Sequence, residues 1–294
     1  MPIQNPAATL KTKPPTHMNA PEKLNSKSEL LRKRYGDGFV PAAGPWNDTI
    51  AGLVSHRSIR SFKQASLEPG TLETLLAAAQ SASTSSNLQA WSVINVTDSA
   101  IRRELAEIAN NQKHIEECSL FLAWLCDLSR IERVGRSTQA DLSPALDLTE
   151  NFLVGSIDAA LAAQNAVVAA ESLGLSCVYI GALRNNAQRV AELLKLPPRV
   201  VAVFGLCIGY AQQDAAIKPR LPQPAVMFEN TYKVTGQESE LLKDYDQILG
   251  EFSRRQEMVN TTWTERIISR IQGKSLGNRA LLRQVLEKLG FPLK

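Results

Sequence analysis

The segment Ser55–Phe62, SHRSIRSF, is unusually dense in side chains that donate hydrogen bonds. Four of its residues carry such donors: His56, Arg57, Ser58 and Arg60. In an extended chain alternate side chains share one side, so His56, Ser58 and Arg60 would converge on a single acceptor. A helix start with its charged side chains in water explains this segment, taken alone, equally well. The sequence therefore leaves two interpretations open, an anion site or an exposed helix terminus.

A second basic pair lies far along the chain, in KPRLP at residues 218–222. Lys218 and Arg220 flank Pro219, whose ring fixes the backbone and gives both long side chains a stiff support. Alone, such a pair is usually a solvated loop. Together with the first segment it could clamp one phosphate. Hydrogen bonds to charged groups contribute roughly 1.5–3 kcal/mol each, so about four would hold a phosphorylated small molecule at a micromolar level after the entropic cost of binding.

The hydroxyl-rich run Ser81–Gln89, SASTSSNLQ, lies between an expected helix and an expected strand. Its backbone N–H groups and rotatable hydroxyls could bind a polyol or the edge of a ring, although such a run is more often a flexible loop. Gln112, in NNQKH, is a further isolated donor. We therefore hold this run as a third candidate ligand-binding segment.

Other kinds of site find little support in the sequence. The chain has three histidines, and no serine–histidine–aspartate order, metal-ligand cluster or carboxylate pair suggests itself. The glycine fingerprint of a dinucleotide-binding βαβ unit and a Walker-type phosphate loop are also missing. We therefore expect a cofactor to carry the chemistry, with neither a metal nor a catalytic side chain.

The composition is that of an ordinary globular protein, with 44% hydrophobic and 21% charged residues in 294. A net charge of +4, without a dense basic stripe, argues against a nucleic-acid partner. The longest apolar runs contain polar residues, so no membrane span is expected. The cysteines lack metal-ligand spacing and are interpreted as buried hydrophobes in a reducing compartment, which predicts a cytoplasmic protein. They are Cys118, Cys126, Cys177 and Cys207.

Residues 1–46 are rich in proline, lysine, asparagine and serine, and are predicted to form a flexible N-terminal extension with one short helix in SKSELLRKRYG. A single domain is expected over 47–294. Its apolar runs predict strands at 90–98, 119–128, 176–183 and 199–210. A helix is predicted at 69–80 with Pro69 in the first turn, and another after a cap near Asp98 or Ser99. Within 184–196, Asn185 with Gln188 resembles a capping box that opens a further helix. Further helices fill the chain from about 241.

The longest predicted helix covers residues 148–173. Leu153, Ile157, Leu161 and many alanines give it an apolar surface, and Gly174 is placed to end it in the left-handed conformation. Small side chains over such a length permit very close packing, typically against another helix. Together the elements predict an α+β chain with four or five strands.

Six motifs occur in an order that resembles one family: HRSIRSF, ASTSSNLQ, QKH, AAQNAVVAAESLGL, YIGALRNN and KPRLP. The chain resembles the FMN-dependent nitroreductases and flavin reductases from about residue 47 to its end, and most of all their NADPH-preferring, oxygen-insensitive nitroreductase branch. The resemblance implies a mainly antiparallel central sheet flanked by helices. It also implies an intertwined homodimer, with the long helix in the dimer core and one FMN at each end of the subunit interface.

The resemblance also implies which residues bind. The FMN ligands would be His56, Arg57, Ser58, Arg60, Ser83, Thr84, Ser85, Gln112, Tyr179, Ile180, Gly181, Ala182, Lys218 and Arg220. Substrates would contact Ser86, Asn87 and Arg254, the last at the 2′-phosphate of NADPH. Ala182 stands where the branch has a glycine, and Asn87 where it has an apolar or aromatic residue.

The implied reaction is a two-electron ping-pong hydride transfer. NADPH would reduce FMN at N5 and leave, and a nitroaromatic, quinone or free flavin would then take the electrons. Arg60 and Gln112 would stabilise the negative charge of the reduced ring near its N1–C2 edge. The alternatives are a flavoenzyme of the same fold that performs dehalogenation or dehydrogenation, or a flavin-binding protein without activity.

Overall fold

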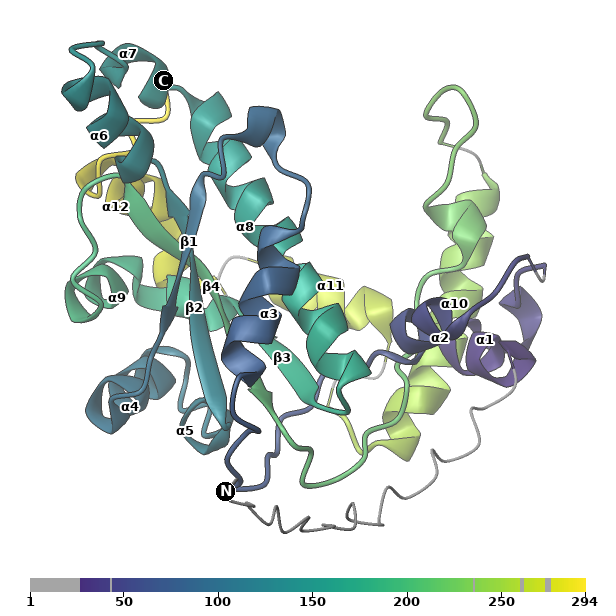
Figure 1. Ribbon diagram of the computed structural model, residues 1–294. Helices are drawn as coiled ribbons and strands as arrows, with labels where there is room; N and C mark the ends of the chain where they lie inside the picture. The colour runs from purple at the N-terminus through teal and green to yellow at the C-terminus, as the bar shows by residue number, and fades with distance from the viewer. Residues whose placement is uncertain (1–26, 43, 235, 260–261, 273–275) are drawn as a thin grey trace, which may run out of the picture.

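The computed structural model describes residues 27–42, 44–234, 236–259, 262–272 and 276–294. Within this part of the chain four strands form one sheet, and every neighbouring pair is antiparallel (Figure 1). Their order is β1-β2-β4-β3. The strands are β1 (Trp91–Asn95), β2 (Leu120–Asp127), β3 (Ser176–Ile180) and β4 (Val200–Gly209). Each lies within a predicted segment, and the predicted α+β class with a mainly antiparallel sheet is confirmed.

The two middle strands are the most apolar, because helices cover both faces of the sheet. All eight residues of β2 are buried. Leu122 and Trp124 point into one apolar cluster with α8, whereas Ala123 and Leu125 point into the other. α4 (Ser99–Ile108), α5 (His114–Glu117) and α9 (Ala187–Leu193) contribute to that second cluster. These two apolar clusters therefore lie on opposite sides of the sheet.

α8 (Thr149–Ser172) and α3 (Thr71–Gln80) pack together on one face of the sheet (Figure 1). A Cβ added at Gly155 would lie 2.5 Å from Cys126 Sγ, so the small residues of α8 allow a very close approach to the sheet. Gly174, at φ +75°, follows the helix as predicted. α8 is also long and apolar enough, by length and composition alone, to cross a membrane. Its alanines are instead part of the core.

The remaining helices lie around this core and beside it. They are α1 (Lys27–Tyr35), α2 (Asp48–Ser55), α6 (Ser129–Ser137), α7 (Ser143–Leu146), α10 (Gln237–Arg255), α11 (Trp263–Ile271) and α12 (Leu282–Lys288). α1, α2 and α10 form a group away from the sheet (Figure 1). α1 is the short helix predicted in the N-terminal extension, and its Leu30 and Leu31 are buried. The division at residue 46 stays a prediction, because residues 1–26 lie outside the described part of the chain.

Two predicted helix starts are wrong by one or two residues. α3 begins at Thr71 behind Gly70, whose left-handed φ of +82° separates Pro69 from the first turn. α9 is capped by Asn186, which accepts a hydrogen bond from the Arg189 N–H. Asn185 cannot serve as the cap, because its side chain donates to the Ile108 carbonyl instead. Of the two caps that the sequence left open, Asp98 and Ser99, the structure has Asp98.

Candidate functional site

The segment that follows α2 is extended and lies along the edge strand β3. Ser58 forms a parallel bridge with Cys177, and the Ile59 N–H donates to the Cys177 carbonyl at 3.1 Å. Phe62 forms a second bridge, with Ala211. Of the two interpretations that the sequence left open for this segment, the extended one is confirmed.

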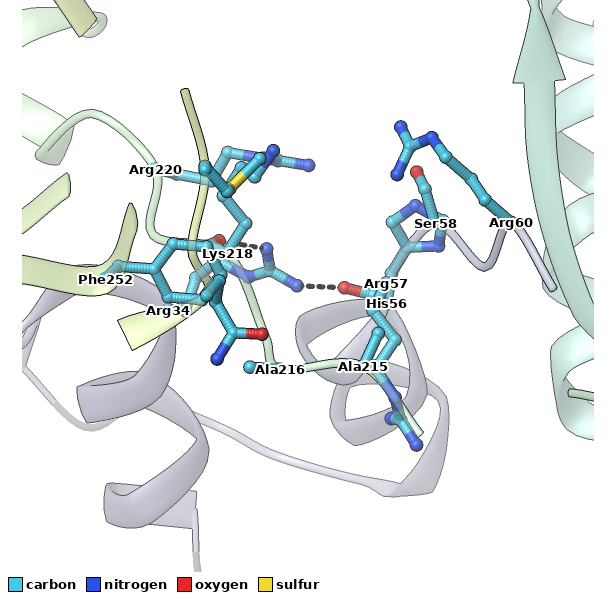
Figure 2. A pocket seen from close by; sticks show the side chains of 12 residues that line it. Arg34, His56, Arg57, Ser58, Arg60, Ala215, Ala216, Lys218, Arg220 and Phe252 are labelled. Carbon is cyan, nitrogen blue, oxygen red and sulfur yellow. Dashed lines mark hydrogen bonds between the residues drawn. The ribbon is translucent and has the colours of Figure 1, made fainter. Parts of the chain in front are cut away.

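The extended segment faces the loop at 218–220 across a cavity of about 270 Å³, which we call the basic cavity. Figure 2 shows Lys218 and Arg220 on one side and Ser58 and Arg60 on the other. The cavity is lined by Arg34, His56, Arg57, Ser58, Arg60, Ala215, Ala216, Lys218, Arg220, Phe252, Gln256 and Met258. Two basic segments about 160 residues apart in the sequence thus meet at one point, as the phosphate-clamp hypothesis predicts.

The positive charges in the basic cavity destabilise one another. Burial lowers the pKa of Lys218, and the nearby charges of Arg266, Arg60 and Arg220 lower it further. No carboxylate is among the lining residues in the part of the chain described. Where neighbouring cations lower the pKa of a lysine, a bound anion reduces the repulsion between them. The basic cavity is therefore an electrostatic site for a negatively charged ligand.

Two carboxylates outside the lining orient two of the donors. His56 Nδ1 lies 2.6 Å from Glu171 Oε1 at the end of α8. Arg57 Nη2 donates to Asp214 Oδ1, also at 2.6 Å. These pairs fix the two side chains at the wall of the cavity while Arg60 and Ser58 remain available to a ligand.

The serine loop, which we define as Ser83–Asn87, does not line the basic cavity. It is anchored instead to Asp158, a carboxylate in the middle of α8 that is only 2% exposed. Asp158 accepts hydrogen bonds from Thr84 Oγ1 at 2.6 Å, from the Ser85 N–H at 3.1 Å and from the Ala90 N–H at 3.1 Å. The loop is thus held by a buried charge-assisted network.

The backbone of the serine loop is strained. Ser86 has φ +47° and Asn87 has φ +55°, and Gln89 follows at +48°. Left-handed conformations at residues with a Cβ cost free energy and persist only where the surroundings enforce them. The bonds to Asp158 hold the chain on both sides of the two predicted substrate residues, Ser86 and Asn87.

The other predicted ligands are not among the residues that line the basic cavity. Gln112 belongs to the turn before α5, where burial and the charge of Arg60 lower the pKa of His114. The run of Tyr179, Ile180, Gly181 and Ala182 continues β3 beyond its bridge to Ser58. Arg254 is in the last turn of α10, two residues beyond the lining Phe252. These roles stay predictions.

Several lining residues were missed by sequence reasoning: Arg34, Ala215, Ala216, Phe252, Gln256 and Met258. Ala215 and Ala216 precede KPRLP and could have been found by extending that motif. Phe252 is in α10, and Gln256 and Met258 follow the end of that helix; none of the three carries a local signal. Arg34 is one of three basic residues in the last turn of α1 and resembles a solvated helix end.

Comparison with known proteins gives the class. The sequence model of the family described as "Nitroreductase family" matches residues 53–210, and that of "Nitroreductase family, C-terminal domain" matches residues 218–294. The FMN reductase (NADPH) of Bacillus subtilis is 39% identical over 250 residues, which cover 83% of this chain and 98% of that protein. The NADPH-flavin oxidoreductase of Vibrio harveyi is 38% identical over 231 residues, covering 78% and 93%.

A solved structure shares the architecture as well. The NfrA1 nitroreductase of B. subtilis superimposes with a TM-score of 0.79 at 38% identity, over 84% of this chain and all of that one. Fold and sequence therefore agree on a class of flavin-linked oxidoreductases. The chain belongs to the nitroreductase family, as the resemblance in its motifs predicted.

Proposed function

We propose that this protein is an FMN-dependent oxidoreductase that uses NADPH to reduce nitroaromatics, quinones or free flavins. The observation that carries the proposal is the basic cavity, in which Arg60 and Lys218 approach one site from segments far apart in the sequence. The relatives support the same reaction, because they are named FMN reductase (NADPH), NADPH-flavin oxidoreductase and nitroreductase.

The donors in the basic cavity fit the phosphate end of FMN. A phosphate monoester carries about −1.5 to −2 charges at pH 7 and offers three acceptor oxygens. Ser58, Lys218 and Arg220 supply hydroxyl, ammonium and guanidinium donors from both sides of the cavity. Burial and the neighbouring cations lower the pKa of Lys218, which is consistent with a site for a negatively charged group.

FMN, when bound, supplies the hydride chemistry, because it accepts a hydride from NADPH and passes it to a second substrate. The chain itself binds and orients. His56, Arg57 and Ser58 with Lys218 and Arg220 would hold the phosphate and polyol. Arg60, together with Gln112, would place positive charge and a donor at the pyrimidine edge of the ring. The four residues from Tyr179 to Ala182 would pass their backbone beside the ring.

We further propose that the protein works as a homodimer. Leu153, Ile157 and Leu161 recur every four residues of α8 and are 48%, 54% and 43% exposed, so they form an apolar stripe on its outer side. A second copy would cover this stripe, and the serine loop of one subunit would then complete the flavin site of the other. Sedimentation should give a dimer, and Ile157→Asp should give monomers that lose FMN; a monomeric wild-type protein would contradict the proposal.

A cytoplasmic location is part of the same proposal. All four cysteines are free and buried, which is typical of proteins in a reducing compartment. Small-molecule electron acceptors, rather than nucleic acid or membrane, are the partners that the basic cavity suits.

The proposed function is tested by reduction of the purified protein under anaerobic conditions. We expect a yellow protein whose flavin absorbance is bleached faster by NADPH than by NADH and is restored by a nitroaromatic or a quinone. A protein that is yellow but bleached by neither nucleotide would be a flavin binder without this activity. A protein that takes up no FMN would contradict the proposal altogether.

A further inference from the structure

Arg34 is a buried arginine that enters the basic cavity from outside the part of the chain matched to the family. It lies in the last turn of α1, whereas the family match begins at residue 53. Its side chain is one of the cavity-lining groups although the residue is only 6% exposed. A buried arginine normally has a defined set of partners, and these partners indicate what Arg34 does.

The guanidinium of Arg34 binds the backbone of both basic segments. Nε and Nη2 donate to the Val54 carbonyl at 3.1 and 2.7 Å, and Nη2 also donates to the His56 carbonyl at 2.6 Å. Nη1 donates to the Lys218 carbonyl at 2.8 Å. Figure 2 shows Arg34 between the two segments, with the bonds to His56 and Lys218 drawn as dashed lines. One side chain thus sets the spacing of the two sides of the cavity.

The main chain of α1 adds a bond in the opposite direction. The Arg220 N–H donates to the Arg34 carbonyl at 2.8 Å. Arg34 therefore fixes the backbone at both residues, through the carbonyl of Lys218 and through the N–H of Arg220. Because the loop between them contains Pro219, little freedom remains in the backbone that carries both side chains.

Arg34 also contributes charge to the cavity. Burial and the neighbouring charge of Arg220 lower its pKa to about 10, so it stays protonated at neutral pH. Four of its five N–H donors are used on backbone carbonyls. Arg34 therefore acts on a ligand mainly through the electrostatic field of its positive charge and through the two segments that it positions.

We propose that α1 of the N-terminal extension is a built-in part of the phosphate site, with Arg34 as a positioning residue for a phosphate monoester. This inference rests on the proposed FMN function. It implies that Arg34 acts mainly at the phosphate end, so that its loss weakens the binding of FMN far more than that of riboflavin, which lacks the phosphate. If Arg34 only held α1 to the protein, its loss would not distinguish the two flavins.

The test is a fluorescence titration of the full-length apoprotein with FMN and with riboflavin. Arg34→Met should raise the FMN dissociation constant about tenfold or more, because one positive charge and the anchor of both basic segments are lost, and leave that of riboflavin within about twofold. Arg34→Lys keeps the positive charge but loses the planar guanidinium with its several donors. Its FMN dissociation constant should lie between those of the wild-type protein and Arg34→Met. Arg32→Met is the matched control, because Arg32 lies on the same helix with a side chain 65% exposed.

Equal changes for FMN and riboflavin, or no change for either, would overturn the inference. Wild-type protein that binds neither flavin would instead overturn the proposed function. Hydrogen exchange of the wild-type protein gives an answer even if Arg34→Met fails to fold. FMN, but not riboflavin, should slow exchange across residues 27–35; protection of 56–60 and 218–220 by FMN without any protection of 27–35 would contradict the role of Arg34.

Discussion

The basic cavity and the serine loop are anchored to α8 at two separate places. His56 of the cavity pairs with Glu171 in the last turn of the helix, whereas Thr84 and Ser85 bind Asp158 in its middle. The two anchors are thirteen positions apart, which corresponds to about 20 Å along a helix. Within one chain the two regions are therefore distinct sites, although both were predicted to hold the same cofactor.

The two regions also differ in which interaction is unfavourable, charge repulsion in the basic cavity and backbone strain in the serine loop. In the basic cavity burial, and then the charges of Arg266, Arg60 and Arg220, lower the pKa of Lys218, and a bound anion would reduce this repulsion. The serine loop has a strained backbone at Ser86 and Asn87, which the hydrogen bonds of a buried carboxylate already offset. The cavity is thus suited to an external anion, whereas the donors Thr84 and Ser85 of the loop are already bound within the chain.

The largest effect is expected from removing two cations of the cavity. Lys218→Met with Arg220→Met should weaken FMN binding about 10²- to 10⁴-fold, because hydrogen bonds to charged groups contribute roughly 1.5–3 kcal/mol each. The melting temperature of the apoprotein should stay the same or rise, because mutual repulsion is relieved. Titration with FMN and calorimetry of the apoprotein would measure the two effects.

The control for this double variant is Arg283→Met, which removes a cation that is 75% exposed and pairs with Glu287 on its own helix. It should leave FMN binding unchanged. A double variant that still binds FMN as tightly as the wild-type protein would contradict the role of the basic cavity as the anion site.

The next largest effect is expected at the serine loop. Asp158→Asn replaces an accepting carboxylate oxygen by an NH₂ group, which cannot accept from Thr84, Ser85 or Ala90. The free energy of unfolding should therefore fall by about 1–3 kcal/mol. Because the loop is proposed to bind the ring or polyol, affinity for FMN and for riboflavin should fall together, about tenfold. Glu150→Gln, on the exposed first turn of α8, is the matched control. A loss confined to FMN would show that the loop serves the phosphate and not the ring.

A smaller effect is expected from pH. Phosphate binding favours protonated Lys218, whose pKa is already lowered in the free protein. FMN affinity should therefore fall as pH rises through that lowered pKa, and Lys218→Arg should abolish the fall, because arginine stays protonated. Below about pH 6 affinity should also fall, since the phosphate gains a proton. Riboflavin affinity measured over the same range should show neither slope.

The smallest effect is expected at Tyr245, which supports the cavity from α10. Its hydroxyl donates to the Pro219 carbonyl at 3.0 Å, and the residue is 5% exposed. Tyr245→Phe should cost about 1 kcal/mol of stability and weaken FMN binding a few-fold. Tyr232→Phe, at a residue 72% exposed, should do neither. An unchanged melting temperature for Tyr245→Phe would show that this bond does not support the loop.

Much of the fold could be predicted, because it follows local patterns. The apolar runs gave the positions of all four strands in the described part of the chain, and the alanine-rich run ending at Gly174 predicted α8. The meeting of Arg60 with Lys218 followed from chemistry, since two donor-rich segments with no other use suggest one shared anion. The family assignment was carried by the order of six motifs and is confirmed.

What the sequence did not reveal depends on contacts between distant residues. Asp158 within an alanine-rich helix was a usable signal, because a carboxylate on a buried face needs partners, but its partners lie about 70 residues earlier. Arg34 carried no such signal. It is one of several basic residues at a helix end, and only the fold brings it to Lys218, 184 residues away.

A crystal structure of the FMN complex tests the central claim most directly. The phosphate oxygens should lie within about 2.7–3.2 Å of donors from both residues 56–60 and residues 218–220. A phosphate bound to only one of these segments, or outside the basic cavity, would contradict it.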